Sequence, residues 1–148
     1  MHGHAGLKLQ INKAHFPVTA LGPGRRLGIW TQGCSIRCPG CVSRDTWDAD
    51  PGRGIEVSAL LDWCREAAAD GCDGVTISGG EPFEQPAALG ALLDGLHAWR
   101  AQGVAFDILC YSGYPLRRLR RHHAGLLAKL DAVVAEPYVD AQIGRAHV

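Results

Sequence analysis

The apolar residues of this 148-residue chain follow two different periods. Four short apolar runs are each followed by a turn that contains Gly or Pro, which is typical of buried parallel strands. These runs are residues 27–31, 74–78, 105–111 and 132–135. Apolar residues at helical spacing predict helices over residues 58–70 and 86–102, and one or two short helices over 115–130. The alternation predicts an α/β fold with parallel strands and right-handed crossovers.

The chain is long enough for one domain with a sizeable core, and no internal repeat or linker divides it. Ahead of the first apolar run, residues 7–12 and 16–20 are expected to form an edge hairpin. The last six residues, IGRAHV, resemble the translation of a common sequencing adapter. We therefore expect a single domain over residues 1–142 and a non-native read-through tail at 143–148, after a C-terminal truncation.

Charge and hydropathy exclude several classes of partner. Lys plus Arg and Asp plus Glu both number 15, and such a balance favours neither nucleic acid nor an anionic membrane surface. The chain has no apolar run of membrane-spanning length, and its start lacks the pattern of a signal peptide. A cytoplasmic protein is expected. In that compartment clustered cysteines more often bind metal or act in catalysis than form disulfides.

Three unusual segments follow the first three apolar runs. GCSIRCPGC occupies residues 33–41, SGGEP occupies 78–82, and YSGY occupies 111–114. In α/β folds the ligand lies beyond the carboxyl ends of the parallel strands. All three segments are therefore expected at the same edge of the sheet.

The cysteines of the first segment have the spacing C-x3-C-x2-C. Structural zinc normally takes four protein ligands, and an ordinary ferredoxin cluster also needs four cysteines. Three ligands with one open position are the arrangement of a catalytic centre. The alternative is a chance grouping or a degraded zinc site, with His122 and His123 as possible outside ligands. The missing fourth cysteine thus predicts an inorganic centre with one position kept for a substrate or cofactor.

This cysteine spacing after the first strand, with SGGEP after the second, resembles the radical S-adenosylmethionine superfamily. The resemblance implies a partial (β/α) barrel with the helices outside the parallel strands. It implies that Cys34, Cys38 and Cys41 hold three irons of one [4Fe–4S] cluster. The methionine amino and carboxylate groups of S-adenosylmethionine then bind the fourth iron.

The glycine turn fits the same resemblance. Gly79 and Gly80 lack a Cβ, so that backbone carbonyls can approach an ammonium group, and Glu81 can add a charge-assisted hydrogen bond. A Gly-Gly-Glu turn alone is weak evidence, because a plain β-turn has the same composition. The resemblance implies that the residues in contact with S-adenosylmethionine are Gly40, Cys41, Val42, Ser78, Gly79, Gly80, Glu81 and Ser112.

Further motifs resemble one subgroup of the superfamily, the activating enzymes of glycyl-radical proteins. GPGRR at residues 22–26, the Gly at position 40, TW at 46–47 and YSGY resemble the small activators of anaerobic ribonucleotide reductase. AEPY at 135–138 departs from the Asp-Gly-Pro-Tyr of that family, so no role is carried to position 135. The resemblance implies a glycyl-radical enzyme as the partner and flavodoxin or ferredoxin as the electron donor.

We therefore interpret the chain as an iron–sulfur enzyme that reductively cleaves S-adenosylmethionine to a 5′-deoxyadenosyl radical and generates a glycyl radical on its partner. One alternative is a radical enzyme that acts on a small molecule or peptide, similar to 7-carboxy-7-deazaguanine synthase. The alternative of another class is a non-catalytic zinc or iron–sulfur binding module.

Cys64 and Cys110 are expected to pack as small apolar residues. The arginines at 117, 118, 120 and 121 are expected on a solvated helix face or a docking patch for an acidic partner.

Overall fold

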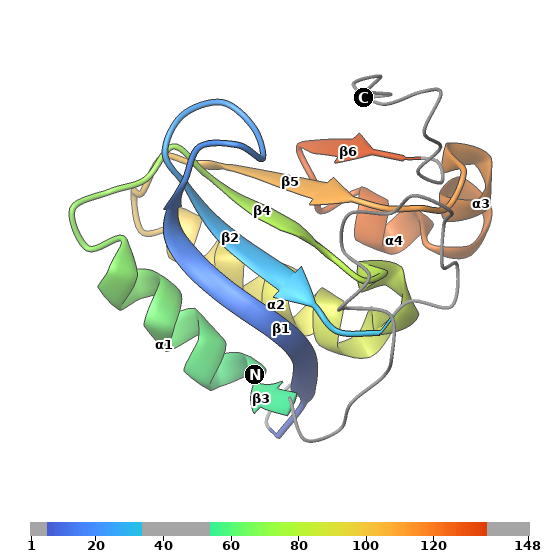
Figure 1. The fold of residues 1–148 in the computed structure, drawn as a ribbon, viewed down its shortest axis with the longest axis horizontal. Coiled ribbons are helices and arrows are strands. Elements are labelled where there is room, and N and C mark those ends of the chain that lie inside the picture. Colours follow the sequence, from blue (N-terminus) through green and yellow to red (C-terminus); the bar gives the residue numbers. More distant parts are fainter. Residues whose placement is uncertain (1–5, 34–53, 136–148) are drawn as a thin grey trace.

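The computed structural model describes residues 6–33 and 54–135 (Figure 1). The expected cluster ligands Cys34, Cys38 and Cys41, with Gly40 and Val42, lie outside the described residues. So do the motif at 46–47 and the expected read-through tail at 143–148.

A six-stranded sheet with the strand order β3-β1-β2-β4-β5-β6 forms the centre of the molecule. Neighbouring pairs among β2, β4, β5 and β6 are parallel, whereas β1 runs antiparallel to both β2 and β3. The elements in chain order are β1 (Lys8–Val18), β2 (Arg26–Thr31), β3 (Gly54–Glu56), α1 (Val57–Ala67), β4 (Gly74–Gly79), the 3₁₀ helix η3 (Pro82–Glu84), α2 (Pro86–Arg100), β5 (Asp107–Tyr111), α3 (Leu116–His122), α4 (Ala124–Leu127) and β6 (Ala132–Val134).

The four predicted parallel strands are confirmed as β2, β4, β5 and β6, and a helix follows each of the first three along the chain. The predicted helices are present as α1, α2 and the pair α3 and α4. Helix α1 ends three residues before the predicted boundary, and Gly71 follows it at φ +102°, with its N–H donating to the Ala68 carbonyl at 2.8 Å. The mixed α/β sheet with parallel strands is therefore as the periodicity predicted.

The predicted edge hairpin over residues 7–12 and 16–20 is wrong. One continuous strand, β1, runs from Lys8 to Val18, and it pairs with β2 along its length and with β3 at its start. The residues in its middle are polar, so the apolar pattern did not predict one strand there. Backbone pairing with β2, rather than apolar burial, keeps these residues extended. Its irregularities are register shifts, one between Ile11 and Lys13 and one between His15 and Val18. Strand β3 was not predicted because only three residues form it.

Helices α1 and α2 cover one face of the sheet (Figure 1). Leu27 and Ile29 of β2, with Val75 and Ile77 of β4, belong to the same buried apolar cluster as the helix residues. Helix α2 supplies more side chains to this cluster than any other element, and complete burial of each leucine contributes about 2 kcal/mol. Its buried residues are Ala88, Leu89, Ala91, Leu92, Leu93, Leu96 and Trp99.

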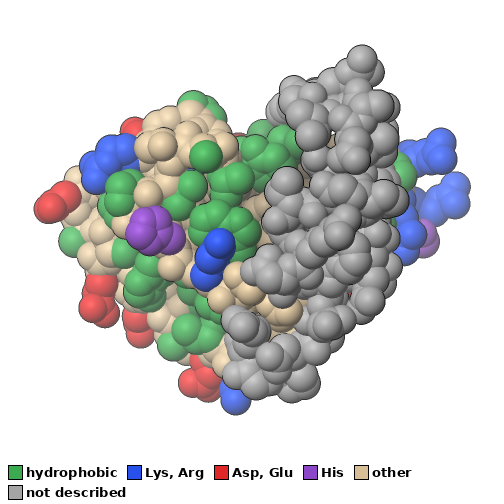
Figure 2. All heavy atoms as spheres, viewed as in Figure 1, with side chains coloured by type: hydrophobic (Ala, Val, Ile, Leu, Met, Phe, Trp, Pro, Cys, Tyr) green, Lys and Arg blue, Asp and Glu red, His purple; other side chains and the backbone are tan. Residues whose placement is uncertain are grey.

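The opposite face of the sheet carries the alternate residues of the same strands. Trp30, Thr76 and Tyr111 occupy these positions, and none of them belongs to the helix-side cluster. Figure 2 shows this side of the molecule, with apolar side chains exposed beside the residues drawn in grey. The part of the chain described by the structure contains no helix of a length and hydropathy suited to crossing a membrane.

Two cysteines outside the predicted cluster segment lie in the core, as predicted. Cys64 of α1 and Cys110 of β5 are fully buried among apolar residues. Burial raises the pKa of the Cys64 thiol to about 12 and that of Cys110 well above its ordinary value. Both side chains therefore remain protonated and behave as small apolar groups.

A buried guanidinium explains the GPGRR segment at the amino ends of the parallel strands. Arg26 is fully buried, and its Nε donates to the Thr76 hydroxyl at 2.6 Å. Its two terminal nitrogens donate to the carbonyls of Pro23 and Val75 and to the Asp107 carboxylate. The motif thus joins β2, β4 and β5 at the end of the sheet opposite their carboxyl termini.

Two glycines leave space for side chains at this end of the sheet. A Cβ on Gly74 would collide with the guanidinium of Arg26, and a Cβ on Gly24 would collide with the Asp73 side chain. Gly24 also has φ +80°, a conformation that residues with side chains rarely adopt. The resemblance to activating enzymes at residues 22–26 therefore rests on residues that stabilise the sheet.

Arg26→Ala is expected to lower the free energy of unfolding by about 3 kcal/mol, because it removes the donor to Thr76 inside the sheet and leaves a cavity. The partner Asp107 is half exposed and keeps its hydration, which limits the loss. Urea unfolding followed by circular dichroism measures the difference. The matched control is Arg25→Ala, since the neighbouring Arg25 is exposed. Equal losses of unfolding free energy in the two variants would contradict this structural role of Arg26.

Candidate functional site

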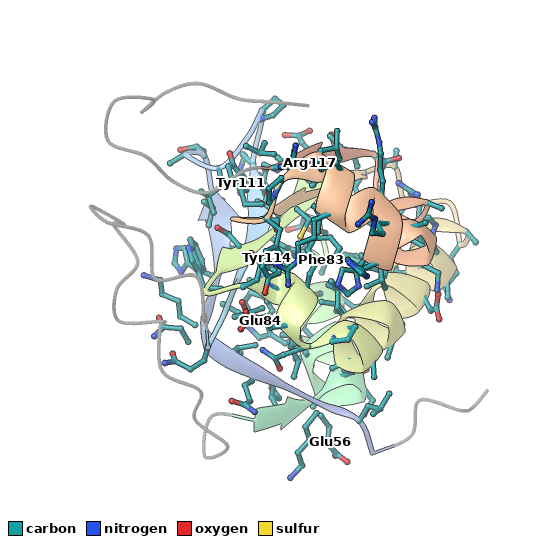
Figure 3. All side chains as sticks on the ribbon, turned by 90° about the vertical axis from the view of Figure 1, so that its right-hand side faces the viewer. Glu56, Phe83, Glu84, Tyr111, Tyr114 and Arg117 are labelled. Carbon is teal, nitrogen blue, oxygen red and sulfur yellow. The ribbon has the colours of Figure 1, made fainter. Side chains whose placement is uncertain are left out.

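The carboxyl ends of β2, β4 and β5 lie together at one edge of the sheet, and Figure 3 looks onto this edge. Backbone pairing between β2 and β4 continues past the ends of the strands. The Gly80 N–H donates to the Thr31 carbonyl at 2.9 Å, and the Glu81 N–H donates to the Gly33 carbonyl at 2.8 Å. Gly33 is the residue before Cys34 in the chain. The start of the cysteine segment is therefore fixed beside the Gly-Gly-Glu turn, as the three-segment prediction required.

Gly79 ends β4 in a conformation that only glycine adopts easily. Its φ is +102°, and a Cβ at this position would collide with the backbone nitrogen and oxygen of Thr31. The Thr31 hydroxyl donates to the carbonyl of Ser78 at 3.1 Å. The first glycine of the turn thus allows two strand ends to touch, so its structural role is separate from any role toward a ligand.

Glu81 is a buried carboxylate that joins two loops. Its Oε1 accepts the Gly113 N–H at 2.7 Å, and its Oε2 accepts the Phe83 N–H at 3.0 Å. The Ser112 hydroxyl lies 3.0 Å from both oxygens. Each carboxylate oxygen therefore has donors from the protein, and the side chain has no solvent-exposed area. We call this set of contacts between Glu81, Phe83, Ser112 and Gly113 the Glu81 brace.

Burial has the largest effect on the pKa of the Glu81 carboxyl group. It raises the pKa of Glu81 to about 7, with the nearby Glu84 adding to the shift. The hydrogen bonds from Gly113, Phe83 and Ser112 act in the opposite direction because they favour the ionised form. The carboxyl therefore titrates near neutral pH.

Aromatic and backbone contacts extend the brace along YSGY. The Tyr114 N–H donates to the Ser112 hydroxyl oxygen at 3.0 Å, and the Tyr114 hydroxyl donates to Glu84 at 2.6 Å. The Ser112 N–H donates to the Val134 carbonyl of β6 at 2.8 Å. Figure 3 shows Tyr114, Phe83 and Glu84 close together at this edge. The loop after β5 is thus held to the loop after β4 at several points.

Gln85 holds the other side of the same edge, and the sequence analysis missed it. Its side-chain Oε1 accepts the Gln10 N–H at 2.7 Å, and its Nε2 donates to the carbonyls of Gln10 and Gln32. The Gln32 side chain in turn accepts from Asn12 at 3.1 Å. No local pattern marks a glutamine before Pro86 as a link to β1 and β2. Only the antiparallel strand β1, whose length was underestimated, brings these partners together.

The site residues predicted among the described positions are therefore placed as follows. Ser78, Gly79 and Gly80 are half-buried at the end of β4, and Ser112 is buried after β5. Within residues 6–33 and 54–135, no three His, Cys, Asp or Glu side chains are grouped so that they could hold a metal ion. The three-thiol donor set that follows Gly33 fits three irons of a [4Fe–4S] cluster and leaves one iron for S-adenosylmethionine.

Residues 20–146 match the family of 4Fe-4S single cluster domains. The chain belongs to this family. An anaerobic ribonucleoside-triphosphate reductase-activating protein of Vibrio cholerae is 28% identical over 135 residues, which cover 86% of this chain and 84% of that protein. The protein of the same name from Escherichia coli K12 is 27% identical over 129 residues, with coverages of 84% and 82%.

Two further similarities cover less of the compared proteins. A pyruvate formate-lyase-activating enzyme of Staphylococcus epidermidis is 37% identical over 97 residues, which are 62% of this chain and 38% of that enzyme. The crystal structure of QueE from Escherichia coli aligns with a TM-score of 0.58 at 19% identity, over 72% of this chain and 53% of that one. This last likeness shows the fold alone.

These findings confirm the predicted class. The protein is a radical S-adenosylmethionine enzyme with one [4Fe–4S] cluster and S-adenosylmethionine as its cosubstrate. The alternative of a non-catalytic zinc or iron–sulfur binding module is thereby set aside.

The titration of Glu81 predicts a specific pH dependence of stability. The folded pKa of about 7 lies above the ordinary 4.5, so at intermediate pH the folded state keeps a proton that the unfolded state releases. This stabilisation is complete below about pH 4.5 and is lost as the pH rises through about 7. Wild-type protein should therefore lose stability relative to Glu81→Gln across that range, as measured by urea unfolding at several pH values.

Glu66→Gln is the control for this titration, because Glu66 is an exposed acid on α1 that does not contribute to the pKa of Glu81. It should follow the wild-type pH profile. A constant difference in unfolding free energy between wild type and Glu81→Gln from pH 4 to pH 8 would contradict the assignment.

Proposed function

We propose that this protein generates a glycyl radical on an anaerobic ribonucleotide reductase. The observation that carries the proposal is the pairing of Glu81 with Gly33, which fixes the start of the three-cysteine segment against the glycine turn. The similarity to two activating proteins over more than four fifths of their length supports the choice of partner. The proposed place of action is the cytoplasm.

Cys34, Cys38 and Cys41 are the proposed ligands of three irons. When bound, the cluster supplies the electron that cleaves S-adenosylmethionine to methionine and a 5′-deoxyadenosyl radical, which takes a hydrogen atom from a glycine of the partner. Reduction depends on an external donor, flavodoxin or ferredoxin in this proposal. The three thiolates leave the fourth iron open to the amino and carboxylate groups of the cosubstrate.

The remaining proposed contacts are backbone and small side chains. Gly40, Cys41 and Val42 are the proposed contacts that lie outside the described residues, and Ser78, Gly79, Gly80 and Ser112 are the proposed contacts at the carboxyl edge of the sheet. We assign Glu81 a positioning role, because donors from the protein already occupy both of its carboxylate oxygens. In this role it keeps the loops after β4 and β5 at a fixed separation. The ammonium group of the cosubstrate is proposed to donate hydrogen bonds to backbone carbonyls of the glycine turn.

The shape of the sheet suits a protein substrate. In our proposal the four parallel strands are part of a partial (β/α) barrel, with α1 and α2 on its outside. The face of the sheet with Trp30, Thr76 and Tyr111 is then the inner face of the barrel. In this proposal a glycine in a loop of a partner protein reaches the carboxyl edge from that helix-free face.

The cluster assignment predicts the effect of removing single thiols. After anaerobic reconstitution, the protein should contain about four irons and four sulfides per chain. Cys34→Ala, Cys38→Ala or Cys41→Ala should abolish this content, as measured by iron and sulfide analysis and visible absorption. The buried Cys64 provides the matched control, and Cys64→Ala should keep the full iron content. Tight binding of one zinc without sulfide would contradict the cluster.

The experiment that tests the function is anaerobic incubation of the reduced protein with S-adenosylmethionine and an anaerobic ribonucleotide reductase from the same organism. Electron paramagnetic resonance should show a doublet from the single remaining α-hydrogen of the glycyl radical. 5′-Deoxyadenosine should form in proportion to it, and oxygen should then cleave the partner chain at that glycine. Deoxyadenosine without a radical on any candidate protein would refute activation and favour a small-molecule or peptide substrate.

A further inference from the structure

Helix α3 presents four arginines on one surface. Arg117, Arg118, Arg120 and Arg121 are all exposed, whereas Leu119 between them is fully buried in the core. At 100° per residue, the four arginines occupy one side of the helix and Leu119 the other. Such repetition of positive charge is unfavourable within a helix, because like charges four residues apart destabilise it. We call these four side chains the α3 arginine surface.

Within the part of the chain that the structure describes, this surface has no acidic partner. Among the described residues, no carboxylate forms an ion pair with Arg117, Arg120 or Arg121. Arg118 instead lies 4.0 Å from the centre of the Tyr114 ring, and the first turn of the helix contains no acidic residue. Two other described arginines that are partly exposed do form ion pairs, Arg65 with Asp62 and Arg100 with Asp131, whereas the exposed Arg25 lies over the Phe16 ring. The positive charge of α3 is therefore not neutralised by an ion pair within the described residues.

The α3 arginine surface adjoins the candidate site. Helix α3 begins directly after YSGY and lies at the carboxyl edge of the sheet (Figure 1). Arg118 stacks on Tyr114, whose hydroxyl is bonded to Glu84 of the turn after β4. Figure 3 shows Arg117 at this same edge. A protein bound to α3 would therefore come close to the cluster segment that starts beside Glu81.

The charge is also concentrated relative to the rest of the chain. The whole protein has 15 basic and 15 acidic side chains, so removing these four arginines leaves 11 against 15. An otherwise acidic molecule with one basic surface orients an incoming partner and raises the rate of encounter. A nucleic acid is a poor match, because its binding would need a basic surplus over a longer surface.

We propose that the α3 arginine surface docks the acidic face of the electron-donor protein. This inference rests on the proposed function, which requires such a donor. Electron-transfer partners form small, short-lived complexes in which charge sets the encounter rate, and a single short helix fits that class. One electron passes from the reduced donor to the cluster, and no atom or proton is exchanged with the arginines. The partner glycine then approaches from the helix-free face of the sheet.

The test compares two triple variants with equal loss of charge. Arg117→Gln/Arg120→Gln/Arg121→Gln removes the surface but keeps the Arg118 contact with Tyr114. The control, Lys8→Gln/Arg25→Gln/Arg65→Gln, removes three basic side chains from β1, the turn before β2, and α1, of which Lys8 and Arg25 are exposed and Arg65 is partly exposed. Flavodoxin from the same organism is the probe. Calorimetry measures its affinity at two salt concentrations, and stopped-flow absorption measures cluster reduction by reduced flavodoxin and by dithionite.

The α3 variant should bind flavodoxin about tenfold more weakly at low salt and lose most of the salt dependence of binding. Its reduction by flavodoxin should slow by a similar factor, whereas reduction by dithionite should stay unchanged. The control variant should match wild type. Equal flavodoxin affinity in wild type and the α3 variant would overturn the proposal.

Two further outcomes are decisive. If dithionite-reduced α3 variant binds flavodoxin normally but fails to activate ribonucleotide reductase, the surface binds the substrate protein and the proposal is overturned. The calorimetric measurement of flavodoxin affinity does not require catalysis. It therefore tests docking even if no glycyl radical forms. A loss of flavodoxin affinity with no radical on any partner would support docking and refute the proposed activation.

Discussion

The arrangement of the candidate site depends on one buried carboxylate. Glu81 has no solvent-exposed area, yet it accepts hydrogen bonds from its own turn and from the loop after β5. An ionised carboxylate without partners in such a place would be strongly unfavourable, so the donors and the acceptor must form together. The backbone of the same residue pairs with Gly33, which precedes the cysteine segment. Three loops from distant parts of the sequence are thereby fixed relative to one another through one residue.

A second buried charge has the corresponding role at the opposite end of the strands. Arg26 joins β2, β4 and β5 at their amino ends, as Glu81 joins the loops at their carboxyl ends. Between these two polar links the strands are held by apolar packing against α1 and α2. The sheet therefore has fixed ends and an apolar middle. This arrangement keeps the carboxyl edge rigid without any covalent cross-link among the described residues.

The sequence predicted best those elements whose burial pattern is set by residues close together in the chain. Apolar runs and helical periods predicted the parallel strands and their helices, because each of these elements buries its own side chains against the core. The long strand β1 was not predictable in the same way, since its middle is polar and its pairing with β2 and β3 is non-local. Gln85 was missed for the same reason, because its partners belong to β1 and to the end of β2.

Motif resemblance selected residues whose contacts within the protein it did not predict. Gly79 and Glu81 were selected as contacts for the cosubstrate, and the structure shows contacts for both within the protein. GPGRR was selected as part of a functional signature, and its arginine is a buried link between strands. Motifs of a catalytic family therefore combine residues that act on ligands with residues that hold the frame. A single sequence cannot separate these two groups, because the separation depends on burial and hydrogen-bond partners.

The burial of Cys64 and Cys110 has a consequence for how the enzyme acquires and recovers its inorganic centre. Iron and sulfide carriers react with thiolates, and these two thiols stay protonated and enclosed by apolar side chains. They are therefore poor competitors for incoming iron, and poor partners for disulfide formation when air destroys a cluster. Burial also raises the pKa of Cys72, which is half-buried. Maturation and repair are thus directed to the one segment in which three thiols stand close together in the sequence.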